Sequence, residues 1–152
     1  YKGEIIGDIF VKSKKILKNI NCPSSLNSNA IDEFLIIFLA AIKTKGISVF
    51  KNLSELNKKE SPRLLIASNI LKKIGVKTKL KSNSIKIYGN PNLNITKKVI
   101  IKNFMKDHRI FMMSCVAALT LGGKFKINDK NSIKTSFPNF ITTLKKIGAK
   151  IV

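Results

Sequence analysis

The chain has 152 residues, 44% of them hydrophobic and 24% charged, and this balance excludes a disordered tail or a low-complexity segment. The longest apolar run, at 34–42, is too short to span a bilayer, so we expect no membrane partner. The formal net charge is +21, but 27 of the 29 basic residues are Lys, and Lys, Ile and Asn all have A/T-rich codons. We therefore interpret the lysines as residues of solvated faces. We expect no nucleic-acid partner, because a protein that recognises bases uses Arg and stacked aromatic residues.

Hydrophobic patterning predicts an α/β chain, α+β in its layering, in which helices cover sheets. In chain order we expect a strand at 4–11, a helix from 32 to 46, a strand at 48–50, a helix from 62 to 75, strands at 76–80, 84–88 and 99–101, a helix at 108–121, a strand at 124–127 and a helix from 137 to 148. The predicted helix caps are Ser28 or Asn29, Ser61, Asp107 and Ser136.

An internal repeat organises these elements. The string Leu-Lys-Lys-Ile-Gly-Val-Lys at 71–77 returns as Leu-Lys-Lys-Ile-Gly-Ala-Lys at 144–150. In each copy the glycine is expected to end a helix. Upstream, the apolar helix that opens at Asp32 is matched by the one that opens at Asp107. The repeating unit is helix, strand, loop, helix, strand, and the chain holds about two copies.

Arg63 and Arg109 are the only arginines of the chain, and both are predicted in the first turn of a helix. Helix N-termini favour anions, and the planar guanidinium of Arg matches a carboxylate or a phosphate. Both residues are therefore candidates for binding an anion. The alternative is structural, with Arg63 paired to Glu60 or Asp107 at a solvated helix end.

Further candidates have two interpretations each. Lys59 and Glu60 form either an ion-pair cluster with Arg63 or an acid–base set beside an anionic substrate. Asp32 is either a partner of the helix dipole or a carboxylate that accepts a proton from a hydroxyl. His108, the lone histidine, is either a neighbour of the helix cap or part of the Arg109 site.

Metal ligands are scarce in this sequence. The two cysteines, Cys22 and Cys115, form no Cys-x-x-Cys pair, and no Cys/His cluster exists. We therefore expect no structural zinc and a reduced, cytoplasmic setting.

Four strings of the chain resemble motifs of the EPSP synthase family of enolpyruvyl transferases, in the same order. They are Ile-Asp-Glu-Phe at 31–34, Lys-Glu-Ser-Pro-Arg-Leu at 59–64, Asp-His-Arg at 107–109 and Thr-Ser-Phe-Pro at 135–138. The family fold has two domains, each of three βαβαββ units. The resemblance implies that residues 1–152 are a fragment from the C-terminal domain, with about two units present, and that the N-terminal domain and the first part of the C-terminal domain lie outside it.

The resemblance also implies an activity. It is the transfer of the enolpyruvyl group of phosphoenolpyruvate to the 5-hydroxyl of shikimate 3-phosphate, with release of phosphate, in the biosynthesis of chorismate and the aromatic amino acids. Phosphoenolpyruvate is a co-substrate, and no metal or redox cofactor is implied. The whole enzyme is expected to be a cytoplasmic monomer, and the fragment alone is expected to be inactive.

The matching motif positions carry implied roles. Arg63 and Arg109 would hold the carboxylate and phosphate of phosphoenolpyruvate. Asp32 would face the attacking hydroxyl of shikimate 3-phosphate as a base or as an orienting group. Lys59 would neutralise and orient the substrates, and Glu60 would move a proton to and from the methylene carbon of phosphoenolpyruvate.

Three positions near these motifs call for separate comment. His108 would shape the Arg109 site and hydrogen-bond near the reacting phosphate. Pro62 stands where the family usually has Asp, which leaves Ser61 to cap the helix. Lys134 is one position further from the Phe-Pro pair than the functional Lys of some members, so no role is carried onto it.

Two alternative functions remain open at this stage. One is the sister transferase that acts on UDP-N-acetylglucosamine, although the strings at 59–63 and 107–109 argue against it. The other is a basic nucleic-acid-binding module, whose binding would fall steeply with salt.

Overall fold

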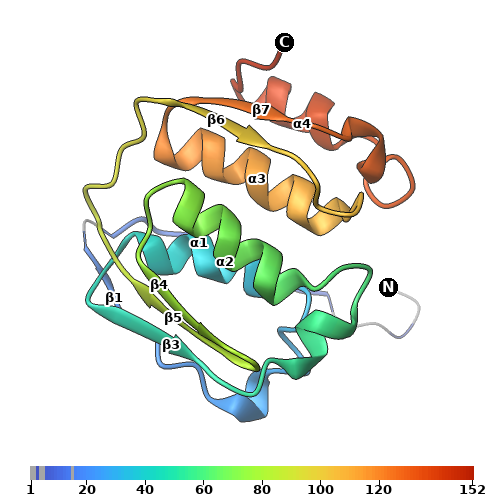
Figure 1. Ribbon diagram of the computed structural model, residues 1–152. Helices are drawn as coiled ribbons and strands as arrows, with labels where there is room; N and C mark the ends of the chain where they lie inside the picture. The colour runs from blue at the N-terminus through green and yellow to red at the C-terminus, as the bar shows by residue number, and fades with distance from the viewer. Residues whose placement is uncertain (1–2, 4–5, 15) are drawn as a thin grey trace.

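Helices lie between two sheets in this protein. The computed structural model describes residue 3, residues 6–14 and residues 16–152, and Figure 1 shows α1, α2 and α3 stacked between β3–β5–β4 on one side and β6–β7 on the other. The helices are α1 (Phe34–Ile42), α2 (Arg63–Lys73), α3 (His108–Leu121) and α4 (Phe140–Lys146), with 3-10 helices η1 (Ser24–Leu26), η2 (Ser54–Lys58) and η3 (Lys130–Ile133). The strands are β1 (Leu17–Lys18), β2 (Thr44–Lys45), β3 (Ile47–Phe50), β4 (Thr78–Lys81), β5 (Ser84–Tyr88), β6 (Lys98–Ile101) and β7 (Lys124–Ile127).

The sheet topology confirms the predicted α/β layering. Strands β3, β5 and β4 form an antiparallel sheet in that order, and β6 pairs with β7 in parallel. A parallel bridge joins Asn21 to Val49 at the edge of β3, after the short parallel pair β1–β2. Apart from the two-residue β2, the succession β1, α1, β3, α2, β4, β5 follows a βαβαββ order, and β6, α3, β7, α4 repeat its first four elements.

The core lies where α1 meets the inner face of the three-stranded sheet. Phe34, Phe38 and Phe50 are fully buried there, and the Phe38 and Phe50 ring centroids lie 5.0 Å apart. Helix α1 is apolar on nearly all sides because α3 packs on it as well as β5. No helix among the described residues is long and apolar enough to cross a membrane.

The repeated Leu-Lys-Lys-Ile-Gly string builds the same helix end twice. Gly75 follows α2 with φ +92°, and its N–H donates to the carbonyl of Lys72 at 3.0 Å, while the next N–H donates to Leu71 at 2.9 Å. The same pair of hydrogen bonds follows α4 at Gly148, where φ is +99°. This is a Schellman motif, and its left-handed residue favours Gly. The prediction that both copies end a helix is confirmed.

The helix caps are confirmed at one position and wrong at the others. Asp107 precedes α3, and its side chain accepts hydrogen bonds from the first turn. Helices α1, α2 and α4 begin without a side-chain cap, so four predicted candidates do not cap: Ser28, Asn29, Ser61 and Ser136. The hydroxyl of Ser61 donates to Asp107 instead, and this contact replaces the predicted cap.

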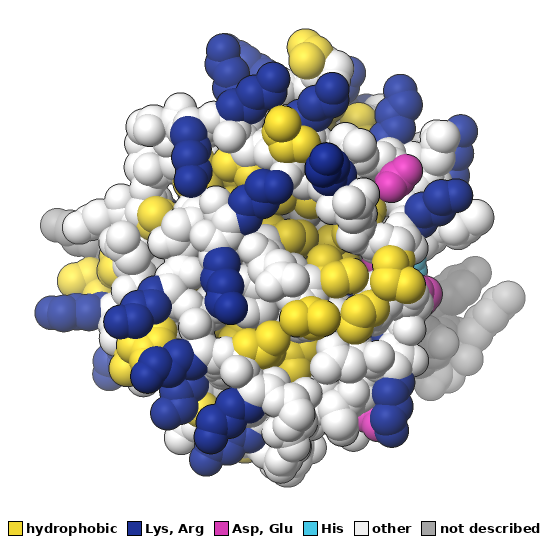
Figure 2. All heavy atoms as spheres, viewed as in Figure 1, with side chains coloured by type: hydrophobic (Ala, Val, Ile, Leu, Met, Phe, Trp, Pro, Cys, Tyr) yellow, Lys and Arg dark blue, Asp and Glu magenta, His cyan; other side chains and the backbone are white. Residues whose placement is uncertain are grey.

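The start of the chain also departs from the prediction. The predicted strand at 4–11 is wrong over 6–11, and residues 4 and 5 lie outside the described residues. Ile9 and Phe10 are about nine-tenths exposed, so no described residue covers the apolar side chains of the predicted strand. Figure 2 shows the lysines scattered over the face turned to the viewer, as expected for solvated residues.

Candidate active site

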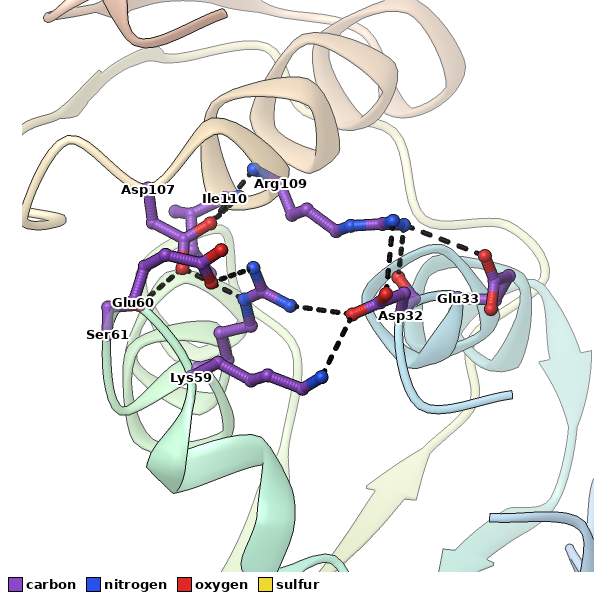
Figure 3. A network of polar contacts seen from close by, with 9 residues as sticks. Asp32, Glu33, Lys59, Glu60, Ser61, Asp107, Arg109 and Ile110 are labelled. Atoms are coloured by element: carbon purple, nitrogen blue, oxygen red, sulfur yellow. Dashed lines mark hydrogen bonds and ion pairs between the residues drawn. The ribbon is translucent and has the colours of Figure 1, made fainter. Parts of the chain in front are cut away.

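Three chain segments meet at the starts of α1, α2 and α3, as Figure 3 shows. The first precedes α1, the second leads into α2, and the third opens α3. Together they bring seven charged side chains into one connected set of contacts, which we call the charged cluster: Asp32, Glu33, Lys59, Glu60, Arg63, Asp107 and Arg109.

Arg63 is the hub of the charged cluster. Its Nε donates to Asp107 Oδ2 at 2.9 Å, one terminal nitrogen donates to Asp32 Oδ1 at 3.0 Å, and the other donates to Glu60. Its side chain is only 2% exposed. The structural interpretation of Arg63 therefore named two of its three partners, Glu60 and Asp107, but the guanidinium is buried rather than solvated.

Asp107 is a fully buried carboxylate that serves two sides. Oδ1 accepts from the backbone N–H groups of Arg109 at 2.9 Å and Ile110 at 3.3 Å, which caps α3. Oδ2 accepts from the Ser61 hydroxyl at 2.8 Å and from Arg63. Burial raises the pKa of Asp107, but the hydrogen bonds from Arg63 and Ser61 outweigh burial, so the net pKa is lowered. The group is therefore ionised at neutral pH.

Asp32 lies between three cations. Its Oδ1 contacts Arg63 at 3.0 Å and Lys59 at 3.6 Å, and its Oδ2 contacts Arg109 at 3.3 Å. Its backbone carbonyl also accepts from Arg109 at 2.9 Å. Burial raises the pKa of Asp32, but the neighbouring charges of Arg109, Lys59 and Arg63 lower it by more, so the net pKa is below the ordinary value. Asp32 is thus a weak base and a well-placed hydrogen-bond acceptor.

The charged cluster has a closed floor and an open top. Arg63 and Asp107 form the floor, whereas the side chains of Lys59, Glu60 and Arg109 are 33%, 54% and 31% exposed. Three cations against four carboxylates give the set a formal charge of −1. To bind here, an anionic ligand has to replace carboxylates at these cations, or further cations from outside the set have to contact it.

The structure brings together five of the six predicted site residues. His108 is the exception: it is the half-buried first residue of α3, and its ring forms no hydrogen bond or ion pair with any described residue. Asp32 precedes α1 by two residues, so the first-turn placement expected for it is wrong. Within the described part of the chain, no group of three or more His, Cys, Asp or Glu residues is arranged to hold a metal ion.

Two contributions to the cluster were missed from the sequence. The Glu33 carboxylate lies 3.6 Å from a terminal nitrogen of Arg109, and no role was predicted for Glu33 from the sequence. The Ser61 hydroxyl binds Asp107, and its place beside Pro62 suggested a cap instead. Only the nearness of Ser61 to Arg63 could have indicated the contact, because both side chains reach the same carboxylate oxygen.

Comparisons with known proteins identify the family of the chain. Residues 9–144 match the family model described as EPSP synthase (3-phosphoshikimate 1-carboxyvinyltransferase). The chain is 37% identical over 149 residues to the 3-phosphoshikimate 1-carboxyvinyltransferase of Ruthia magnifica subsp. Calyptogena magnifica, covering 98% of this chain and 33% of that protein. It is also 37% identical over 145 residues to the protein of that name from Thermodesulfovibrio yellowstonii, covering 95% and 33%.

A solved structure shows the same fold. The EPSP synthase of Acinetobacter baumannii superposes with a TM-score of 0.79 and 31% identity, over 86% of this chain and 30% of that chain. The chain thus spans about a third of the length of the curated relatives that it matches. The matched residues include all three segments of the charged cluster, and on this evidence the chain belongs to the EPSP synthase family.

Proposed function

We propose that the whole protein whose reading frame encodes these 152 residues is an enolpyruvyl transferase. In this proposal, the enolpyruvyl group of phosphoenolpyruvate passes to the 5-hydroxyl of shikimate 3-phosphate, and phosphate is released. The observation that carries the proposal is the charged cluster, in which five of the residues at family motif positions meet at three helix starts. The names of the relatives support it.

Arg109 is the residue we assign first to phosphoenolpyruvate. Its guanidinium is 31% exposed, and its contacts to the Asp32 and Glu33 carboxylates, at 3.3 and 3.6 Å, are longer than a charge-assisted hydrogen bond of about 2.8 Å. A phosphate or carboxylate can therefore replace these contacts. Arg63 uses three of its five N–H groups on carboxylates, which leaves two for an anion that approaches past Glu60.

Proton handling is divided between the two more open carboxylates. The lowered pKa of Asp32 suits a carboxylate that orients the attacking hydroxyl rather than one that removes its proton. Glu60, whose side chain is 54% exposed, is placed to move a proton to and from the methylene carbon. Lys59, 3.6 Å from Asp32, neutralises and orients shikimate 3-phosphate, and His108 hydrogen-bonds near the phosphate.

The charge of the site bears on how it works. Both substrates are anions, whereas the charged cluster alone carries −1. We assign the missing positive charge to cations outside the charged cluster. The proposal includes no metal or redox cofactor, and it describes a cytoplasmic monomer acting on small molecules. Preorganised cations then stabilise the anionic tetrahedral intermediate.

The test is phosphate release from phosphoenolpyruvate by the whole protein. Shikimate 3-phosphate is the acceptor in one reaction and UDP-N-acetylglucosamine in a parallel one. We expect release only with shikimate 3-phosphate. Release only with UDP-N-acetylglucosamine would assign the protein to the sister activity, and no release from folded protein would refute the proposal.

Matched variants test the site within the same assay. Arg109→Lys keeps the charge but loses the planar fork, so we expect kcat/KM for phosphoenolpyruvate to fall by about 10- to 100-fold. Glu55→Gln breaks an exposed ion pair to Lys58 outside the charged cluster and serves as the control with unchanged kinetics. Intact turnover in Arg109→Lys would show that the site is wrongly assigned.

A further inference from the structure

Asp107 reaches both arginines but does not face the open side of the charged cluster. Its side chain is fully buried, so it contacts neither solvent nor an approaching ligand. We propose that Asp107 is a positioning residue that fixes Arg63 through one carboxylate oxygen and Arg109 through the other. The expected effect on phosphoenolpyruvate binding rests on the proposed function, whereas the placement of the two arginines by Asp107 does not depend on it.

The first route runs through Oδ2 to the side chain of Arg63. A guanidinium is planar, so holding Nε at 2.9 Å also sets the directions of both terminal nitrogens. Those nitrogens donate to Asp32 and Glu60, the two carboxylates assigned to the reaction. The Ser61 hydroxyl, 2.8 Å from the same oxygen, restrains the carboxylate from the side of α2.

The second route runs through Oδ1 to the backbone of α3. That oxygen accepts from the N–H groups of Arg109 and Ile110, which fixes where the helix begins. Arg109 extends from this first turn, and its guanidinium donates to the backbone carbonyl of Asp32 at 2.9 Å. The position of the open arginine therefore depends on the cap.

The two routes meet again at Asp32, which closes a ring of contacts. Asp107 Oδ2 binds Arg63, Arg63 binds Asp32 Oδ1, Asp32 Oδ2 binds Arg109, and the N–H of Arg109 returns to Asp107 Oδ1. Asp107 is the buried member of the ring that touches both arginines through different oxygens. A change at Asp107 therefore moves both anion-binding groups, although no substrate atom contacts it.

The variant that separates the two routes is Asp107→Ser. Serine keeps an oxygen for the first turn of α3 because it is as good a cap as Asp, but it leaves the buried Arg63 without its partner. Asp107→Asn, which keeps the shape of the side chain, is the second variant if the serine protein does not fold. Glu55→Gln, which breaks an ion pair of the same 2.9 Å length at the surface, is the control.

Two measurements on the whole protein test the proposal. The first is steady-state kinetics, in which we expect KM for phosphoenolpyruvate to rise by about 10- to 100-fold and KM for shikimate 3-phosphate to rise much less. The second is modification by phenylglyoxal with peptide mapping by mass spectrometry. Arg63, whose side chain is 2% exposed, should resist modification in the parent protein and react several-fold faster in the variant.

Each outcome decides a separate point. A folded Asp107 variant with unchanged KM for phosphoenolpyruvate would overturn the positioning role in an active enzyme. If the parent protein releases no phosphate, the proposed function fails, and the modification rates then decide the placement of Arg63. Unchanged protection of Arg63 in the variant would overturn that placement, and faster modification would support it.

Discussion

The buried carboxylate of Asp107 makes the free energy of unfolding depend on pH in the acid range. Its pKa is lowered below the ordinary value of 3.8, because the hydrogen bonds of Arg63 and Ser61 outweigh burial. A carboxylate with a lowered pKa adds stability that is fully present above its unfolded-state pKa. That stability is lost as the pH falls below 3.8 and through the folded-state pKa. Asp107→Asn removes this contribution at neutral pH while keeping the side-chain volume.

The size of the stability loss in Asp107→Asn follows from the two sets of donors that Asp107 binds. Asparagine has one carbonyl oxygen, so it can face either the N–H groups of α3 or Arg63 and Ser61, but not both. Turning its NH2 group toward α3 loses the cap, at about 1 kcal/mol. Turning it toward Arg63 leaves a buried guanidinium short of one partner, at about 3–5 kcal/mol. Because Arg63 keeps Asp32 and Glu60, we expect a loss of about 2–3 kcal/mol, between these limits.

Thermal unfolding followed by circular dichroism measures this loss. A loss of about 2–3 kcal/mol lowers the midpoint by roughly 4–12 °C in a chain of this size. Glu55→Gln, in an exposed pair of the same length, should leave the midpoint unchanged. The difference between parent and Asp107→Asn should narrow as the pH falls below 3.8. A difference that stays constant over that range would refute the assignment of the stability to an ionised carboxylate.

Three further predictions concern other parts of the molecule. Gly89→Ala would place a Cβ 2.1 Å from the backbone carbonyl oxygen of Thr44, so we expect a loss of about 1–3 kcal/mol by chemical denaturation; a stability equal to the parent's would mean that the approach is looser. Phe38→Ala empties a fully buried site and should cost about 3–5 kcal/mol in the same measurement, unlike a substitution at a solvated position. Burial raises the pKa of the Cys115 thiol to about 12, so at neutral pH a thiol reagent should modify the half-buried Cys22 and spare Cys115; equal rates would contradict the buried placement.

Local signals in the sequence predicted most of the fold. The helices were found because apolar faces run up to glycines, and Gly75 and Gly148 end theirs as expected. The helix predicted from 32 to 46 is shorter, Phe34–Ile42, because the chain turns at Lys43 into the strand pair β1–β2. Strands of two residues are too short for any periodicity to show. The strand at 4–11 was predicted from local apolar residues, which say nothing about a pairing partner.

The site could be predicted in its members but not in its geometry. Arg63 and Arg109 stood out because a lysine-rich chain retains only these two arginines. Their contacts to Asp107 and Asp32 join residues 44 and 77 positions apart, and no local pattern carries such a separation. The burial of Arg63 was missed for the same reason, because the carboxylates that allow it come from three helix starts.

The buried pair of Arg63 and Asp107 also constrains how this sequence can change over generations. Most positions that need only a positive charge can accept lysine, and 27 of the 29 basic residues are lysines. At Arg63 a lysine would offer one point charge to three carboxylates that now meet three separate nitrogens of a fork. Replacing Asp107 first would leave the buried guanidinium short of a partner, and replacing Arg63 first would leave the buried carboxylate without its cation. A single substitution at either residue therefore leaves a buried charge without its partner, so we expect the two residues to be replaced together or not at all.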